Sequence, residues 1–579
     1  MQKQSVEAGR DELLAARRES RGLYWAVGIF SFFVNLLMLT GPLYMLNVYD
    51  RVLGSRSFET LLALTILVAF LYGMMGILDY ARGRVMGRVG ARFQARLDRR
   101  VFSAVLKATT LNRAPKEAAT GMRDLESVQR LITSPALMAI FDAPWTPIFL
   151  FGIFIFHPMM GYLAVGGGAV LILFAILNQL STRKPLASAN ATAFQSEAMS
   201  AEIRAESEMV HSLGMRKSAF DRWQIARNAS LEATVGAADA AGTYTSLIKA
   251  FRLFLQSAML GLGAYLVLQE QLTPGAMIAG SILLGRALAP IELLVGQWAV
   301  FQRAKEGWNN LAVLLSAIPE DEARTELPKP EARIKVHQLT VVPPGEQTAA
   351  LRTISFDLEP GHAVGVIGTS GSGKSTLARA LTGVWRPAGG KIRLDGAALD
   401  QYDPDALGQH IGYLPQRVQL FDGTIKENIA RMSMKPDDAA VIEAAKKADA
   451  HSMILQLPDG YDTRVATHGG RLSGGQIQRI GLARAMYGDP VILVLDEPNS
   501  NLDNAGSMAL NNAIKQAKAD GKVVFIMAHR PAAIQECDLL LMIENGGLRA
   551  FGPKEEVLKS TVRNLHEIAN TAGVSGGVA

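Results

Sequence analysis

The 579-residue sequence predicts an α-helical membrane domain of six spans, followed by a cytoplasmic α/β domain that contains a phosphate loop. Three observations predict this fold class. Charged residues make up only 19% of the chain, whereas soluble proteins average about 25%. Six apolar stretches each approach the length of about 20 residues that a bilayer requires. In the second half of the chain, a glycine-rich loop stands between an apolar strand and a helix.

Residues 1–21 carry four arginines among acidic side chains and lack a cleavage site, which predicts a cytoplasmic N-terminal segment. The membrane domain, residues 22–315, follows. One apolar stretch alone could be a buried helix of a soluble protein, but six such stretches with alternating charge between them favour a membrane domain. We place the spans near residues 22–46, 58–80, 135–156, 158–180, 247–268 and 273–297.

The connections between the spans differ in length and charge, and this difference predicts the orientation of the chain. The three short connections are poor in positive charge and are expected outside. Loops 81–134 and 181–246 are long, basic and compatible with helix, and the first contains twelve basic residues. The positive-inside rule places such loops in the cytoplasm. Because the basic residues gather there rather than on a soluble domain with interleaved aromatics, we expect no nucleic-acid binding.

The charged, proline-containing residues 316–331 are expected to form a linker. From residue 332 to residue 565, short apolar strands alternate with helical stretches, which predicts a mainly parallel sheet covered by helices. This is the expected nucleotide-binding domain. The last residues, 566–579, contain mostly glycine, serine, valine and alanine and are expected to be a flexible tail.

The phosphate loop is the strongest motif in the chain. Its glycines let backbone N–H groups converge on phosphate oxygens, Lys374 neutralises the β and γ phosphates, and Ser375 offers its hydroxyl to Mg²⁺. A Gly/Ser surface loop could have a similar composition, but the apolar strand 363–367 before it and the helix after it favour a phosphate site. The loop reads Gly368, Thr369, Ser370, Gly371, Ser372, Gly373, Lys374, Ser375 and Thr376.

A second strand, residues 490–495, ends in Asp496 and Glu497. Ligands of parallel α/β sheets bind at the carboxyl ends of the strands. Asp496 is therefore placed to hold Mg²⁺, and Glu497 is placed to orient or deprotonate the attacking water. An isolated Asp-Glu pair would be weak support, because acidic residues often end strands.

Four further strings appear in a fixed order: residues 411–416, which end in Gln416, residues 472–476, residues 501–503 and residues 528–530. With the phosphate loop and the Asp-Glu pair, they resemble the nucleotide-binding domain of ABC transporters. The resemblance implies that Gln416 senses the γ-phosphate and Mg²⁺. It also implies that Asp503 lies at a dimer seam and that His529 contacts the γ-phosphate. Read singly, each could be a polar loop residue.

Residues 472–476 look like the ABC signature, which in that family caps the γ-phosphate bound by the opposite subunit. Glycines and a serine at a helix start would present N–H groups to an anion. The chain has one copy of each motif and six spans, whereas a full transporter needs two sets, so we expect a homodimer with two composite ATP sites. The signature residues named for this site are Ser473, Gly474, Gly475 and Gln476.

The sequence departs from the family pattern at two places. Residues 339–345 contain no aromatic side chain that could stack on adenine, so the phosphates are expected to dominate recognition of ATP. Residues 465–468 read Val-Ala-Thr-His where many exporters carry a glutamate that contacts the membrane domain.

The membrane half looks like the six-helix ABC exporter fold, in which tips near residues 110–124 and 209–223 couple the ATPase to the spans. Within this fold the cargo could be a lipid, a drug, a peptide or a protein. Residues 41–52, 141–147 and 496–503 resemble the ATPase of type I protein secretion systems, protease-exporter branch.

That resemblance implies export of unfolded polypeptides with an uncleaved C-terminal signal across the bacterial inner membrane. It also implies two partners, a periplasmic adaptor and an outer-membrane channel. With only residues 1–21 before the first span, no N-terminal peptidase domain is expected. Two alternatives remain open: a lipid or small-molecule exporter, and a membrane-tethered regulatory ATPase.

Of the charged residues in the predicted spans, three are singled out: Asp142 in the third, and Arg286 and Glu292 in the sixth. Charges are costly in lipid and are expected to face one another or a wet cavity. They could line a polypeptide pathway, or they could form structural ion pairs between helices.

Overall fold

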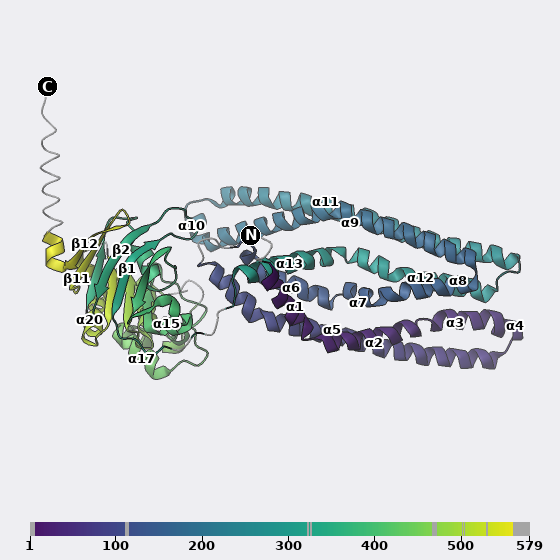
Figure 1. Cartoon of the computed structure of the whole chain (residues 1–579), viewed down its shortest axis with the longest axis horizontal. Helices are drawn as coiled ribbons and strands as arrows, with labels where there is room; N and C mark the ends of the chain where they lie inside the picture. Colours follow the sequence, from purple (N-terminus) through teal and green to yellow (C-terminus); the bar gives the residue numbers. More distant parts are fainter. Residues whose placement is uncertain are drawn as a thin grey trace, which may run out of the picture. The chain divides into compact units, whose positions relative to one another are not determined.

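The computed structural model describes residues 6–110, 115–320, 324, 327–465, 472–500, 502, 504–528 and 531–559. The chain divides into two compact units: an all-helical unit that ends at Glu320 and a second unit that carries all the described strands (Figure 1). The expected tail, 566–579, lies outside the described residues.

Six helical segments of the described chain are long and apolar enough to span a membrane, as the sequence predicts. Two of them are divided: the first into α2, α3, the π-helix η1 and α4, and the third into α7, η3 and α8. The six segments are Arg21–Ser55, α5 (Phe58–Ala108), Pro135–Phe156, α9 (Pro158–Ala205), α11 (Arg216–Leu268) and α12 (Pro274–Gly296).

Loops 81–134 and 181–246 are helical over most of their described length. Helices α5, α9 and α11 run on from their spans without a break, and α9 and α11 lie side by side (Figure 1). The chain reverses between α5 and α6 (Gly121–Thr133), and again through the short helix α10 (Ser207–Ser212). Continuous helix satisfies the backbone as the chain passes from lipid to water, so no irregular segment is needed at that boundary.

The N-terminal segment contains a packed helix, α1 (Glu7–Arg18), which contacts α13 (Trp298–Ala317). The backbone N–H of Gly9 donates to Ser316 Oγ at 2.8 Å. Arg100 of α5 joins the same contact: its Nε donates to Glu12 Oε1 at 2.7 Å, and its Nη2 donates to the carbonyl of Ile318 at 2.6 Å. The segment before the first span is therefore part of the helical unit.

The partly buried carboxylate of Asp142, in the third span, pairs with α5. Arg82 Nη1 donates to Asp142 Oδ1 at 2.7 Å, and Asn35 Nδ2 donates to the same oxygen at 2.7 Å. Arg82 is only 7% exposed. We expected Asp142, Arg286 and Glu292 to face one another or a wet cavity, or to form structural ion pairs, and Asp142 forms such a pair with Arg82. The sequence analysis missed Arg82 because the predicted second span ended at residue 80, whereas α5 continues.

Glu292, the acidic residue of the sixth span, pairs with Arg252 of α11, with Nε and Oε2 3.1 Å apart. Asp142 and Glu292 are the two acidic residues of the spans that the sequence analysis singled out. Both take part in ion pairs between helices. This arrangement supports the structural alternative for Asp142 and Glu292, because pairing offsets the cost of charge in a membrane domain.

The connection between the first two spans is attached to the start of the sixth. Asp50 lies in the π-helix η1 (Val48–Val52), and π-helical turns often mark functional positions. Its carboxylate accepts hydrogen bonds from Thr273 Oγ1 at 2.6 Å and from the N–H of Gly275 at 2.8 Å. A negative charge at a helix N-terminus is favourable. A Cβ at position 275 would lie 2.6 Å from Asp50 Oδ1, so the contact requires glycine there.

The second unit contains two main sheets and a short two-stranded one. The four-stranded sheet, in the order β2-β1-β4-β5, is antiparallel, which the sequence analysis did not foresee. The six-stranded sheet has the order β12-β11-β3-β10-β9-β6, and only β12 is antiparallel to its neighbour. This sheet confirms the predicted parallel core.

The strands of the four-stranded sheet are β1 (Ile334–Val341), β2 (Leu351–Leu358), β4 (Gly389–Leu394) and β5 (Ala397–Ala398). Those of the six-stranded sheet are β3 (Ala363–Ile367), β6 (Ile411–Leu414), β9 (Ile492–Asp496), β10 (Val523–Met527), β11 (Leu539–Glu544) and β12 (Gly547–Pro553). The short sheet pairs β7 (Gly423–Thr424) with β8 (Arg464–Val465). The main helices are α14 (Lys374–Leu381), α15 (Pro404–His410), α16 (Ile425–Ile429), α17 (Asp438–Lys447), α18 (His451–Leu455), α19 (Gly474–Met486) and α20 (Asn504–Ala519).

Both faces of the parallel sheet are buried. Along β9, Ile492 and Val494 belong to one apolar cluster, whereas Leu493 and Leu495 belong to the other. Near-continuous apolar strands are typical of a sheet covered on both sides.

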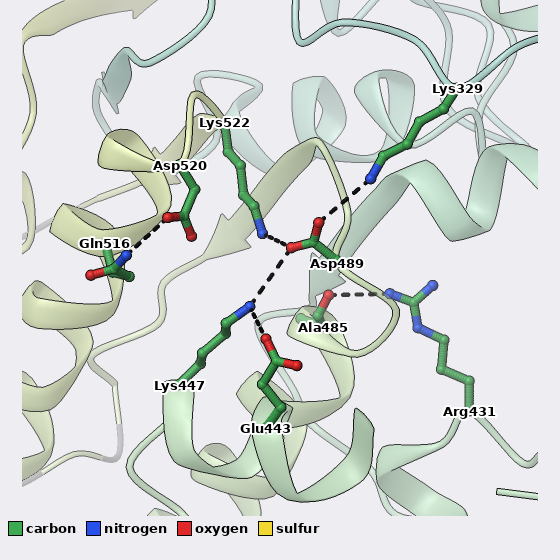
Figure 2. A network of polar contacts seen from close by, with 9 residues as sticks. All are labelled: Lys329, Arg431, Glu443, Lys447, Ala485, Asp489, Gln516, Asp520 and Lys522. Atoms are coloured by element: carbon green, nitrogen blue, oxygen red, sulfur yellow. Dashed lines mark hydrogen bonds and ion pairs between the residues drawn. The ribbon is translucent and has the colours of Figure 1, made fainter. Parts of the chain in front are cut away.

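A polar network fixes the amino ends of β9 and β10 (Figure 2). Asp489, just before β9, accepts a hydrogen bond at 2.5 Å from Lys522, just before β10. Lys447 and Lys329 also approach this carboxylate, at 3.7 and 3.5 Å. The hydrogen bond from Lys522 lowers the pKa of Asp489 most, although partial burial opposes the shift. Asp489 therefore stays ionised and holds the two strand starts together.

The contact between Asp50 and α12 leads to a prediction. Replacing Gly275 with alanine should lower the free energy of unfolding by about 1–3 kcal/mol, because the new Cβ displaces the carboxylate. Thermal unfolding of the detergent-solubilised chain measures this change. Gly285→Ala on the same helix is the matched control, because its Cβ would meet no atom within 4 Å. Equal midpoints for the two variants would contradict the prediction.

Candidate nucleotide site

The registers of four parallel strands bring the predicted site residues to one edge of the sheet. Met527 of β10 lies opposite Val366 of β3 on one side and opposite Asp496 of β9 on the other. Leu414 of β6 lies opposite Leu495 of β9. The segments that follow these strands therefore leave the sheet together, at the edge where ligands bind in parallel α/β sheets.

The phosphate loop joins β3 to α14, as predicted. Gly373 has φ +107°, and a Cβ there would lie 2.9 Å from the carbonyl oxygen of Ala350, so only glycine fits. The Lys374 ammonium donates to the carbonyls of Gly368 and Thr369, both at 2.9 Å. It therefore lies inside the curve of the loop that would receive phosphate.

Electrostatics and one unpaired hydroxyl also suit this loop to an anion. Burial lowers the pKa of Lys374, while the carboxylates of Glu497 and Asp496 oppose the shift. Ser372 is 3% exposed, and within the described residues its Oγ has no hydrogen-bond partner. A buried polar atom without a partner calls for an explanation, and phosphate oxygens would supply an acceptor.

Two of the predicted Mg²⁺ ligands meet directly. Burial raises the pKa of Asp496, while a hydrogen bond with Ser375 and the charges of Arg379 and Lys374 lower it. Asp496 is 2% exposed. Carboxylate and hydroxyl oxygens are ligands that suit Mg²⁺ beside substrate phosphates, so these two residues fit the ion. Gln416 follows β6 by two residues and is exposed, and the register of β6 with β9 brings its segment to the same edge.

Glu497 has an unusual backbone conformation. Its φ is +51°, in the left-handed region that residues other than glycine rarely adopt. Its N–H donates to the carbonyl of Met527 at 3.0 Å, and its own carbonyl accepts from the N–H of Ser500 at 3.2 Å. Such a conformation costs about 1–3 kcal/mol and is common at functional sites. The backbone therefore turns sharply at Glu497, directly after Asp496.

The signature forms the start of α19, as predicted. Ser473 is the N-cap: its Oγ accepts from the N–H of Gln476 at 3.3 Å, and Gln476 Oε1 accepts from the N–H of Ser473 at 2.8 Å. This is a reciprocal capping box. The side chain of Gln476 therefore stabilises the helix start, while Gly474 and Gly475 form its first turn. Asp503 and His529 lie outside the described residues, as do residues 466–468.

Sequence reasoning missed two residues of the site. Arg379 of α14 lies close enough to influence Asp496, and its guanidinium lies 4.6 Å from the ring centroid of Trp385. Gln478 of α19 donates to the carbonyl of Pro498 at 3.1 Å. The available sequence signal for Gln478 was a glutamine two residues beyond the signature. No sequence signal marks Arg379.

Comparison with known proteins agrees with these motifs. Residues 351–500 match the family described as ABC transporter, and residues 24–288 match the family described as ABC transporter transmembrane region. A solved structure of a bacterial Atm1-family ABC exporter with ATP bound superposes with a TM-score of 0.78. It is 23% identical in sequence and covers 97% of this chain and 99% of its own, which supports the fold.

Two curated relatives extend over nearly the whole sequence. The type I secretion system ATP-binding protein PrsD of Rhizobium meliloti (strain 1021) is 42% identical over 549 residues, which is 95% of this chain and 94% of PrsD. The leukotoxin translocation ATP-binding protein LktB of Mannheimia haemolytica is 28% identical over 551 residues, which is 93% of this chain and 77% of LktB. The chain therefore belongs to the ABC transporters, and among them to the family of type I secretion system ATP-binding proteins.

Proposed function

We propose that this chain hydrolyses ATP to export unfolded proteins, as the ABC component of a type I secretion system in the bacterial inner membrane. The assembly of Lys374, Ser375, Asp496 and Glu497 at one sheet edge carries the ATPase part of the proposal. The six membrane-capable segments and the 42% identity to PrsD support the transport part. The nucleotide-binding domain is cytoplasmic in this proposal, because the basic extensions of the spans are expected inside.

At the nucleotide, the N–H groups of the phosphate loop and the Lys374 ammonium bind the phosphates. Ser375, Asp496 and Gln416 would hold Mg²⁺, which supplies charge neutralisation at the β and γ phosphates. Glu497 orients or deprotonates the attacking water, and His529 contacts the γ-phosphate. Residues 339–345 offer no ring for adenine, so the phosphates supply most of the recognition.

The active form in this proposal is a homodimer. Ser473 and Gly474 are exposed at the N-terminus of α19, where free N–H groups and the helix dipole favour an anion. We propose that they cap the γ-phosphate held by the partner subunit, with Asp503 at the seam between the subunits. The chain carries one phosphate loop and one signature, so two chains make two equivalent sites.

The cargo is an unfolded protein with an uncleaved C-terminal signal, passed to a periplasmic adaptor and an outer-membrane channel. PrsD is described as a type I secretion protein and LktB as a leukotoxin translocation protein, which supports protein cargo. The turn after α5 and the turn through α10 are proposed to couple ATP hydrolysis to rearrangement of the spans. Export of a lipid or small molecule, and regulation without transport, are the competing outcomes of the tests below.

The role of Glu497 can be tested by substitution. Glu497→Gln should leave ATP binding intact and lower steady-state turnover about 100-fold or more, because the general base is lost. Nucleotide binding and phosphate release are measured on the same preparation. Glu443→Gln is the control, since Glu443 is an exposed residue that pairs with Lys447 on α17. Normal turnover in the Glu497 variant would refute the assigned role.

The shared site can be tested by mixing two inactive chains. Lys374→Ala removes the phosphate contact of one chain, and Ser473→Arg blocks the signature of the other. A mixed dimer retains one intact composite site, so random mixing should restore activity well above that of either variant alone. Lack of any rescue, with mixed dimers verified by two affinity tags, would argue that the signature does not act across the dimer.

The cargo class can be tested by copurification. Tagged C-terminal fragments of candidate secreted proteins from the same organism should bind the detergent-solubilised transporter and change its ATPase rate, whereas N-terminal fragments of the same proteins should do neither. Stimulation by lipids or drugs without any response to the C-terminal fragments would favour a lipid or small-molecule exporter. A rate that responds to none of these ligands would favour the tethered regulatory ATPase.

A further inference from the structure

One buried hydrogen bond joins the signature helix to the segment that carries the proposed catalytic base. Gln478 of α19 is 2% exposed, and its Nε2 donates to the carbonyl oxygen of Pro498 at 3.1 Å. Pro498 directly follows Glu497 in the chain. Because proline has no N–H, this carbonyl is the only backbone hydrogen-bonding group that Pro498 can offer.

The contact holds the chain at the point where Glu497 is strained. Glu497 has a φ of +51°, a conformation that persists only where the surroundings fix it. On its N-terminal side, the N–H of Glu497 is held by Met527 of β10. On its C-terminal side, the Gln478 amide holds the next residue. The first bond holds the peptide unit before Glu497 and the second holds the peptide unit after Pro498, so together they restrain the backbone on both sides of the glutamate.

Helix α19 is well placed to act as the fixed support for this contact. At its start, the N–H of Gln476 is capped by Ser473 Oγ, and the N–H of Ser473 is capped by Gln476 Oε1. Near its C-terminal end, Arg484 Nη1 donates to the carbonyl of Gln419 at 3.0 Å, and the backbones of Ala485 and Arg484 accept from Arg431 at 3.2 Å. The helix is thus attached along its length to neighbouring segments, including the one that follows Gln416.

We propose that Gln478 is a positioning residue for ATP hydrolysis: its amide holds the Pro498 carbonyl and so aims the carboxylate of Glu497 in the same chain. A glutamine suits this position because its neutral amide donates a hydrogen bond without placing a charge in a buried site. The inference rests on the proposed role of Glu497 as the residue that orients or deprotonates water. It adds a residue outside the motifs that define the nucleotide site.

The first test removes the donor and keeps the length of the side chain. Gln478→Met should lower kcat for ATP about 10-fold and leave KM within about twofold. A misaligned base stabilises the transition state less, whereas the binding of ATP in the ground state stays the same. Gln516→Met is the matched control, since the Gln516 amide is exposed on α20 and donates to Asp520 at 2.9 Å. Unchanged kcat in a folded Gln478→Met variant would overturn the proposal, as would a loss confined to KM.

The second test distinguishes a role of Gln478 in orienting Glu497 from a role in stabilising helix α19. Gln478→Glu places a carboxyl group beside the Pro498 carbonyl, and burial raises the pKa of such a group. Below that pKa the O–H donates as the amide does, and above it the carboxylate repels the carbonyl. The kcat of this variant relative to wild type should therefore rise as pH falls from about 8 to 6, while the relative kcat of Gln478→Met stays flat. Parallel pH profiles for both variants would overturn the proposal.

The third test uses the mixed dimers described above. Gln478→Met should reduce the rescued activity when it is placed in the Ser473→Arg chain, which supplies the working phosphate loop and Glu497. In the Lys374→Ala chain, which supplies only the signature, it should have no effect. The reverse pattern would assign Gln478 to the signature and refute the aiming of Glu497. The Glu497→Gln result tests the proposed function separately, so the two ideas can fail independently.

Discussion

The parallel pairing of β10 with both β3 and β9 is the constraint on which the nucleotide site depends. This pairing aligns the carboxyl ends of β3 and β9. The phosphate loop and the Asp496–Glu497 pair therefore leave the sheet at the same edge. A register shift of one residue would turn every side chain of β9 to the opposite face. Asp496 would then lose its contact with Ser375. The residues of β9 that alternate between the two buried apolar clusters would each be turned away from their own cluster.

Strand β9 is held at both of its ends by groups remote in sequence. At its amino end, Asp489 pairs with lysines from the residue before β10, from α17 and from the segment before β1. At its carboxyl end, Met527 and Gln478 hold the backbone on either side of Glu497. The strained conformation of Glu497 persists because these contacts leave the chain little freedom to relax. The same rigidity lets a side chain be placed to within the tolerance that phosphoryl transfer requires.

Local patterns predicted much of this structure. Six apolar stretches gave six membrane-capable segments, and the strand–loop–helix context of the phosphate loop gave β3 and α14. Contacts between distant residues were not predictable in this way. Arg82 and Asp142 are 60 positions apart, and Asp50 and Thr273 are 223 apart. Periodicity and motif spacing report on neighbours along the chain, so they show that Asp142 needs a partner but not which residue supplies it.

The pairing of Arg82 with Asp142 also bears on how the membrane domain is made. The second span is complete before the ribosome reaches Asp142, so Arg82 initially has no acid from the third span beside it. Its acidic partner at that stage is Asp79 of the same helix, with Nη2 and Oδ1 2.8 Å apart in the finished structure. Charged side chains are costly in the bilayer even so, and they favour the headgroup region. The third span therefore supplies a second carboxylate, Asp142, when Arg82 becomes buried, and the first three spans reach their final packing as a group. Neutralising Asp142 would thus affect assembly of the nascent chain as well as the finished fold.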